Sequence, residues 1–288
     1  MFLNQIKTVI LLAGLSGLFF LIGFWFGGSN GLIVAFAFSI IMNFLTYFYS
    51  DKLVLAMYGA KELDHDKFAY VYAMVQDLCD NAQLPMPKLW FIDTPMANAF
   101  ATGRNPAHAS VAVTQGLLEV LEEHELRGVL AHELAHVKNR DILIATIAAT
   151  LATAIGYLAH MVQWAFIFGG YGKSDERSNG GGIGALVIAI IMPIAAMLIQ
   201  MAISRSREYL ADESGANYAH DPLALASALE KLHNTADKQH LAPASSAHAA
   251  TASLFIVFPF SAKGALSLFS THPPMEKRIE RLRKMAGI

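Results

Sequence analysis

Long uncharged stretches constrain this chain more than any other feature of its sequence. No charged residue occurs within 9–28, 32–50, 142–168 or 183–204. About 20 consecutive apolar residues are enough for a helix to cross the hydrocarbon core of a bilayer. We therefore predict an integral membrane protein whose four transmembrane helices form two hairpins.

Two alternatives to membrane-spanning helices exist, and the sequence disfavours one of them more than the other. A cleaved signal peptide is disfavoured at the N-terminus, because no convincing small-residue cleavage site follows the first stretch and a second span comes at once. The helices at 142–168 and 183–204 could instead be buried or lie on the membrane surface, although both exceed the length of ordinary core helices. The composition, 55% hydrophobic and 15% charged, agrees with a membrane protein.

The basic residues beside the spans predict the orientation. If four helices cross, one side receives Lys7, Lys52, Lys138, Arg140, Arg205 and Arg207. The other side receives only Lys173 and Arg177, which Asp175 and Glu176 offset. Because positive residues collect on the cytoplasmic side, we expect the polar blocks 51–141 and 205–288 to lie in the cytoplasm. The chain then divides into an anchor at 1–50, a first catalytic part at 51–141, a second hairpin at 142–204 and a second catalytic part at 205–288.

Charge and cysteine content exclude some classes of function. The formal net charge of −2 offers no basic surplus for nucleic acid, so we expect no such partner. The one cysteine, Cys79, cannot form an internal disulfide or a multi-cysteine metal site, and we interpret it as a buried structural thiol.

The segment that carries the chemistry is His132-Glu133-Leu134-Ala135-His136. Leu126, Val129, Leu130, Leu134 and Val137 repeat around it at helical spacing, so the motif is expected on a helix. Residues four apart share a helix face, which lets both imidazoles bind one zinc ion with Glu133 beside it. A catalytic zinc keeps one position open for water, and Glu133 would take the proton of that water as general base.

A catalytic zinc needs a third protein ligand, and the sequence offers Glu208 as a candidate. Glu208 and Asp212 are four apart, just after the last uncharged stretch. An antiparallel membrane hairpin would bring this segment beside the end of the first motif. Without that motif, the favoured interpretation would be a solvated cluster in which both carboxylates pair with Arg205 and Arg207.

The order of these features resembles the HtpX group of the M48 metallopeptidase family. The resemblance rests on a double-span anchor, HELAH, a membrane hairpin and SRSREYLAD, and it covers nearly the whole chain. It implies a mainly α-helical, gluzincin-type metallopeptidase domain with a small β-sheet, added to the four transmembrane helices. In such a domain His132, His136 and Glu208 bind one Zn²⁺ per subunit, Glu133 is the base, and Asp212 orients a ligating histidine.

Two further patches are similar to features of that family. Asn98, Ala99 and Phe100 lie in a stretch predicted to form a small β-hairpin, and in related enzymes the matching edge strand binds the substrate backbone. A purely structural strand is the alternative. His272 precedes a basic helix predicted at 275–285, and by resemblance it hydrogen-bonds the oxyanion of the reaction intermediate. A histidine in this place is otherwise just a helix cap.

Together these observations predict a zinc endopeptidase of the bacterial inner membrane that cleaves misfolded or membrane proteins at the cytoplasmic face. The resemblance implies a role in quality control under stress, with polypeptides and the lipid bilayer as partners. One alternative is a narrow processing peptidase of the CAAX type, although four spans leave little room for its large chamber. Another is a silent membrane scaffold with a structural zinc, which would have no use for Glu133.

Overall fold

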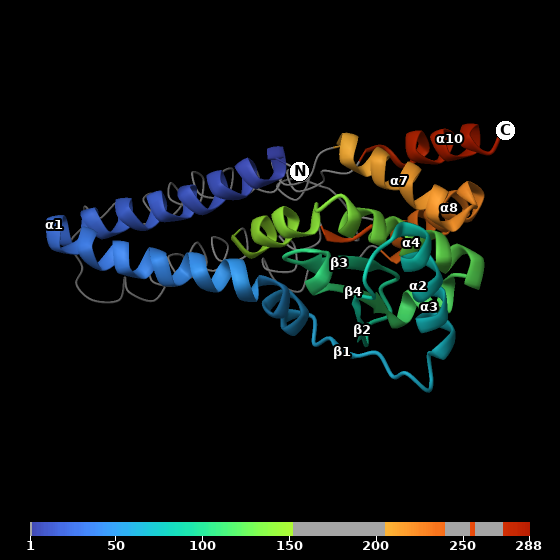
Figure 1. Cartoon of the computed structure of the whole chain (residues 1–288), viewed down its shortest axis with the longest axis horizontal. Helices are drawn as coiled ribbons and strands as arrows, with labels where there is room; N and C mark the ends of the chain where they lie inside the picture. Colours follow the sequence, from blue (N-terminus) through green and yellow to red (C-terminus); the bar gives the residue numbers. More distant parts are fainter. Residues whose placement is uncertain (1, 152–204, 240–253, 257–272) are drawn as a thin grey trace, which may run out of the picture.

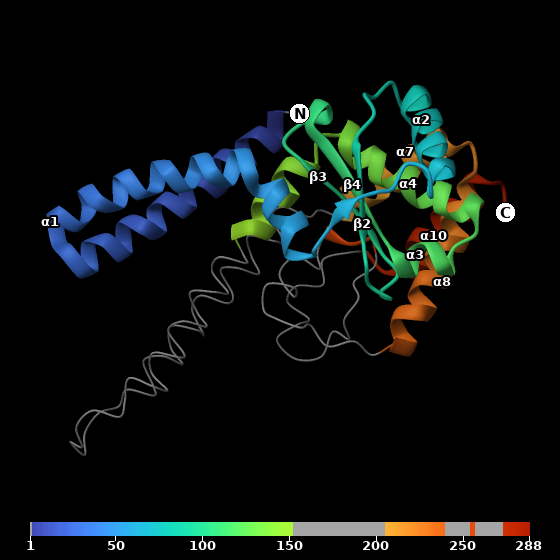
Figure 2. The ribbon, with the colours of Figure 1, turned by 90° about the horizontal axis from the view of Figure 1, so that it is seen from below.

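A long helical hairpin stands away from a mixed α/β body in the computed structural model (Figures 1 and 2). The structure describes residues 2–151, 205–239, 254–256 and 273–288. The hairpin is α1 (Phe2–Met57), which reverses direction at Gly28, where φ is 53° and ψ is −136°. Its two arms touch at Gly23 and Gly31, where an added Cβ on Gly31 would lie 1.9 Å from the Gly23 carbonyl oxygen.

The hairpin carries the strongest membrane signal among the described residues. Gly27–Met57 is the one helix there that is long and apolar enough to cross a membrane. Ile6–Gly17 and Ile142–Leu151 are shorter apolar helices. Side chains such as Ile33 and Val34 leave about 70% of their surface exposed, which suits contact with lipid. Most of the second predicted hairpin, residues 152–204, lies outside the described residues.

The body contains a four-stranded mixed sheet in the order β1-β2-β4-β3. Its strands are β1 (Lys61–Glu62), β2 (Lys88–Ile92), β3 (Ala99–Gly103) and β4 (Ala109–Thr114). The predicted hairpin is β3 with β4, which the short 3₁₀ turn Pro106–His108 connects. The sheet is larger than predicted, because β2 pairs in parallel with β4 and β1 adds antiparallel to β2.

Each face of the sheet buries a different partner, because successive strand residues point to opposite sides. Val111 and Val113 of β4 face the main core, which the helices build. Ala112 and Phe100 face the other way, towards Val54 and Leu55 at the end of α1. The sheet therefore links the helical hairpin to the body.

Helices cover the main-core face, and α4 (Glu123–Lys138) lies at their centre. Around it pack α2 (Ala69–Ala82), α7 (Arg205–Ala219) and α8 (Pro222–Gln239). The short α3 (Gln115–Val120) precedes α4, and α10 (Met275–Met285) packs on α7 and α8. The basic helix predicted at 275–285 is thus confirmed.

Two glycines and one buried carboxylate fix the position of α4. An added Cβ on Gly128 would lie 2.7 Å from the Leu225 nitrogen of α8, and one on Gly215 of α7 would lie 2.8 Å from the His132 nitrogen. At the start of α4 the buried Glu125 accepts a hydrogen bond from the Glu122 backbone at 2.9 Å and one from Lys231 of α8 at 2.8 Å. These contacts place the helix that carries the predicted motif.

Candidate metal centre

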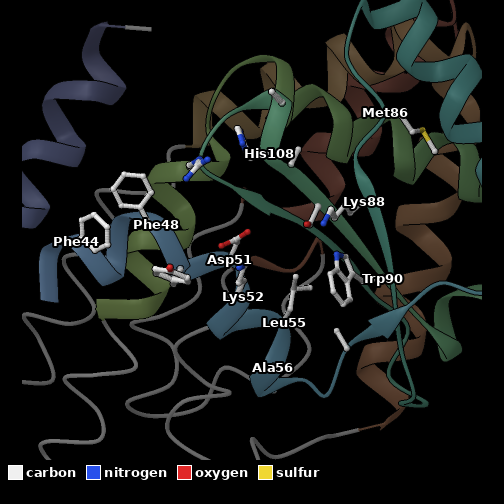
Figure 3. Close-up of a pocket in the computed structure, with 16 residues that line it drawn as sticks. Phe44, Phe48, Asp51, Lys52, Leu55, Ala56, Met86, Lys88, Trp90 and His108 are labelled. Carbon is white, nitrogen blue, oxygen red and sulfur yellow. The ribbon is translucent and has the colours of Figure 1, made fainter. Parts of the chain in front are cut away.

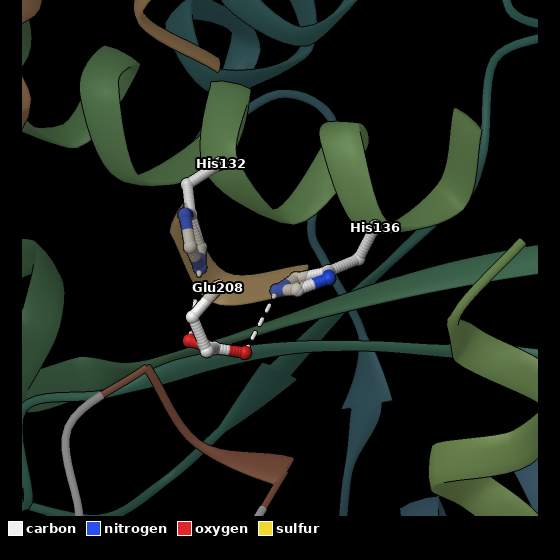
Figure 4. Close-up of side chains that lie close together, drawn as sticks. All are labelled: His132, His136 and Glu208. Atoms are coloured by element: carbon white, nitrogen blue, oxygen red, sulfur yellow. Dashed lines mark ion pairs between the residues drawn. The ribbon is translucent and has the colours of Figure 1, made fainter. Parts of the chain in front are cut away.

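His132 and His136 lie one turn apart on α4, as predicted, with their rings turned towards a common point (Figure 4). The ring centroids are 4.8 Å apart and the ring planes are nearly perpendicular, at 89°. His132 is buried, and the side chain of His136 is 16% exposed. Two imidazoles in this geometry can share one ion and still leave access from one side.

Glu208 reaches the same point from α7. Its Oε1 lies 3.4 Å from His136 Nε2, and its Oε2 lies 3.9 Å from His132 Nε2. The three ligand atoms lie within 4.8 Å of one another, and Glu208 is buried. Two imidazole nitrogens and one carboxylate oxygen, with room for a fourth ligand, fit a catalytic zinc ion. The close approach of α7 to α4 at Gly215 explains why Glu208 arrives there.

Arg207, the residue before Glu208, is directed elsewhere. Its Nη1 lies 3.4 Å from Asp141 Oδ1, and Glu208 instead faces the two histidines. The alternative in which the carboxylates at 208 and 212 form a solvated cluster with Arg205 and Arg207 is therefore wrong.

Asp212 lies behind His132, one turn of α7 beyond Glu208. Its Oδ1 is 2.9 Å from His132 Nδ1, close enough to accept the ring proton and so to leave Nε2 facing the metal position. Burial alone would raise the pKa of Asp212, but the Arg278 guanidinium and His132 lower it to about 2. Asp212 is therefore a permanent negative charge beside the histidine.

Arg278 of α10 holds Asp212 at two points. Its Nε and Nη2 donate to the two carboxylate oxygens at 2.8 and 2.6 Å. Its Nη1 donates to the Ile256 carbonyl at 3.2 Å and lies 3.7 Å from Glu208 Oε2. Arg278 is fully buried, so this charge is balanced inside the protein rather than by water.

Asp141 stands behind the second histidine because of the way α4 ends. Arg140 has a left-handed φ of 58°, and the Asp141 backbone N–H donates to the His136 carbonyl at 3.0 Å. This turn brings Asp141 Oδ2 to 3.4 Å from His136 Nδ1. Burial lowers the pKa of His136, but Asp141, Glu208 and Glu133 outweigh it and raise the pKa to about 9. The carboxylates that favour a positive charge on His136 would also stabilise a cation bound at this point.

Glu133 is buried beside the histidines and faces the sheet. The Ala101 backbone N–H of β3 donates a hydrogen bond to its carboxylate. Burial, with Glu208 nearby, raises the pKa of Glu133 to about 8, despite the opposing effect of His136. A carboxylate with a pKa near the working pH can both accept and return a proton.

The residues predicted to bind substrate lie on and beside the edge strand β3. Asn98 is buried and pairs with Thr114 of β4, and Phe100 points into the cluster on the far face. In the antiparallel pattern, Ala99 and Ala101 turn their backbone groups away from β4. Ala101 binds Glu133, and the Ala99 carbonyl accepts a hydrogen bond from the Ile256 N–H at 3.3 Å.

The site residues predicted from the sequence and those that the structure shows are not the same set. His272, with its predicted oxyanion role, lies outside the described residues. Sequence reasoning missed Arg278 and Asp141. Arg278 had a signal, because it falls in phase with the apolar residues Met275, Ile279 and Leu282 of its helix. Asp141 had none, because its position depends on the turn that ends α4.

Comparison with known proteins finds relatives that cover nearly the whole chain. The model of "Peptidase family M48" matches residues 65–286. A "Protease HtpX homolog" from Syntrophobacter fumaroxidans is 53% identical, covering 98% of this chain and 99% of that protein. One from Thermococcus kodakarensis is 52% identical, covering 98% and 96%. The crystal structure of S. mikatae Ste24p superposes with a TM-score of 0.51 at 17% identity, covering 97% of this chain and 65% of that one, which shows a shared fold.

Proposed function

Because the chain belongs to peptidase family M48, in its HtpX group, we propose that it is a zinc endopeptidase that cleaves polypeptides at the cytoplasmic face of the membrane. Membership makes it a membrane protease of the metallopeptidase type. Zinc as the metal, the cytoplasmic face and the choice of substrates are parts of the proposal.

The observation that carries the proposal is the convergence of His132, His136 and Glu208 within 4.8 Å, with Glu133 next to them. A structural zinc is usually closed by four protein ligands, whereas three protein ligands leave a place for reacting groups. A zinc ion held here would supply a Lewis acid and bring the pKa of water at the site towards about 7.

Residues of the chain supply the proton transfer and hold the histidines in position. Glu133 accepts a proton from the attacking water and returns it to the nitrogen of the leaving amine. Asp212 and Asp141 hold His132 and His136 in fixed orientations from behind. Burial of Glu133 and His132 keeps bulk water from competing at these positions.

The edge of β3 suits the binding of an extended peptide. A polypeptide added along this edge is bound through its backbone, so that affinity requires little sequence preference. The Ile256 N–H, which now bonds the Ala99 carbonyl, and the Asn98 Oδ1, which accepts from the Ala99 N–H at 3.2 Å, would have to give way to the substrate backbone. A site of this kind suits misfolded or membrane proteins, and hence quality control under stress.

Closeness to the bilayer supports membrane proteins as substrates. Asp141, which contacts His136, directly precedes the apolar helix Ile142–Leu151. The metal position therefore lies within a few residues of the predicted third span.

The test is cleavage of unfolded casein by the full chain purified in detergent. We expect cleavage with zinc present, none with a chelator, and none from Glu133→Gln. Glu213→Gln, on the exposed face of α7, is the matched control and should cleave as the wild type does. Loss of activity in Glu133→Gln is expected to reach at least about a thousandfold, because the base and the open metal position act as a unit.

Two results would contradict the proposal. Cleavage that persists in Glu133→Gln would show that Glu133 is not the general base. A chain that binds zinc stoichiometrically and cleaves nothing under any condition would favour a structural metal site.

A further inference from the structure

A pocket of about 760 Å³ lies where the second arm of α1 meets the sheet (Figure 3). Residues of α1, of β2 and of the turn before β4 line it. None of His132, His136, Glu208 and Glu133 is among them, so the pocket is separate from the metal centre.

Three cationic side chains line this pocket from three different parts of the chain. Lys52 comes from α1, Lys88 from the start of β2, and Arg104 from the loop after β3. Asp51 is the one carboxylate in the lining, which leaves a positive excess. Within the part of the chain that the structure describes, none of these three cations forms an ion pair with a carboxylate.

Aromatic side chains form the other part of the lining. The Arg104 guanidinium lies over the ring of Phe48, 5.2 Å from its centroid, and Lys52 Nζ lies 5.1 Å from the centroid of Tyr49. Phe44, one turn earlier on α1, is 55% exposed. The pocket thus combines cations with partly exposed aromatic rings.

The position of the pocket along α1 fixes its depth in a membrane. The apolar helix Gly27–Met57 has its first charged residue at Asp51, in the pocket itself. Phe44 and Phe48 lie on the apolar side of that point, Lys52 lies just beyond it, and the Arg104 guanidinium reaches the ring of Phe48. This change from apolar to aromatic to basic residues matches the order of acyl chains, interface and phosphates in a bilayer leaflet.

We propose that this pocket binds the headgroup of an anionic phospholipid. Lys52, Lys88 and Arg104 neutralise the phosphate, while Phe44 and Phe48 contact the glycerol and the first carbons of the acyl chains. Because α1 and β2 both contribute, a bound lipid sets the catalytic body against the bilayer surface. Lipid binding here depends on α1 being in the membrane and is independent of the peptidase reaction.

Lipid binding to the full chain in detergent, measured by native mass spectrometry, tests this proposal. The probes are dioleoylphosphatidylglycerol, zwitterionic dioleoylphosphatidylcholine and the soluble headgroup analogue glycerol 1-phosphate. We expect a tight phosphatidylglycerol adduct, weakened roughly 10- to 100-fold in the triple variant Lys52→Gln, Lys88→Gln, Arg104→Gln. The matched control Lys277→Gln, Arg283→Gln, Lys284→Gln removes the same charge from the exposed face of α10 and should bind as the wild type does.

The outcomes separate the possible ligands. Unchanged phosphatidylglycerol binding in the triple variant would overturn the proposal, as would equal affinity for phosphatidylcholine. Equal affinity for glycerol 1-phosphate would show a site for free anions rather than lipid, which also overturns it. The thermal midpoint of each variant reports whether it is folded. If the triple variant does not fold, the three single variants decide between these outcomes. Each single variant is expected to weaken phosphatidylglycerol binding several-fold.

Discussion

Arg278 has an unusual place for an arginine, because it is fully buried next to the proposed metal ligands His132 and Glu208. Burying a guanidinium is unfavourable unless carboxylates and hydrogen bonds balance it. Here the guanidinium donates hydrogen bonds to both carboxylate oxygens of Asp212, and Asp212 contacts the ring of His132. We therefore expect Arg278 to be a positioning residue, which acts through Asp212 and through its own approach to Glu208 Oε2 at 3.7 Å and to His132 Nε2 at 3.5 Å.

Arg278→Gln should weaken zinc affinity about 10- to 100-fold, because Asp212 would lose the partner that orients it. Arg278→Lys should recover only part of the zinc affinity, because lysine keeps the positive charge but cannot bond both oxygens of Asp212 as a guanidinium does. Competition with a chromogenic chelator measures both. The control is Arg281→Gln on the same helix, where the guanidinium lies over the ring of Tyr209. Zinc affinity in Arg278→Gln equal to that of the wild type would show that Arg278 only fills space.

Cys79 is the buried thiol that the sequence suggested. Burial, with Asp80 nearby, raises its pKa to about 11. At a pH of about 8 the thiol stays protonated, and the thiolate is the reactive form. We expect maleimide to modify the native chain at least about tenfold more slowly than the chain unfolded in dodecyl sulfate. Rapid, stoichiometric modification of the native chain would contradict this placement.

Among single residues, the sequence predicted what local spacing encodes. His132 and His136 follow from a four-residue repeat on a helix whose apolar residues keep the same phase. Glu208 required an argument about how two distant segments meet, and the structure brings it to the histidines. Asp141 could not be predicted, because a left-handed residue at Arg140 decides where it points.

At the scale of elements, the metal centre depends on how closely α7 approaches α4. Gly215 allows this approach, because it presents no side chain to the backbone at His132. The interface therefore ties the position of Glu208 to the backbone of the HELAH helix.

Gly215→Ala should separate the two helices slightly. Its Cβ would meet backbone atoms of α4, which cannot rotate away, so we expect a loss of about 1–3 kcal/mol in the free energy of unfolding. Zinc affinity should fall as well, because Glu208 moves with α7. The neighbouring Ser214→Ala adds no bulk and is the control. Thermal unfolding and chelator competition measure the two effects, and a Gly215→Ala chain that matches the wild type in both would show that the close approach is not needed.

The elements themselves differ in how far the sequence revealed them. The helix of α4 and the β3–β4 hairpin follow from short-range patterns. The parallel pairing of β2 with β4 does not, because β3 lies between them in the chain and no turn signal marks the pairing. The edge position of β3, on which substrate binding depends, is a property of the whole sheet.

For the whole molecule, the architecture places the candidate metal ligands close to Asp141, which directly precedes the shorter apolar helix Ile142–Leu151. The first hairpin is seen as the two arms of α1, and of these Gly27–Met57 is long enough to span. The crossing of residues 142–204 and the cytoplasmic location of the body stay predictions. The orientation follows from the charge bias of the flanking lysines and arginines.

A cysteine placed at Ser178, which lies outside the described residues, tests this topology. With four crossing helices, a membrane-impermeant maleimide should modify it only from the side opposite the catalytic body. A cysteine at Lys277 on α10 is the control for the cytoplasmic side, and the slow reaction of Cys79 keeps the background low. Modification of the Ser178 cysteine from the cytoplasm alone would overturn the predicted topology.

The measurement that tests the central claim most directly is the zinc content of the purified full chain with and without Glu208. We expect one zinc per chain in the wild type and in Glu133→Gln, and well under half of that in Glu208→Gln after dialysis against a weak chelator. Glu213→Gln should keep its zinc. If Glu208→Gln retains one zinc per chain and cleaves casein as the wild type does, the assigned metal centre is wrong.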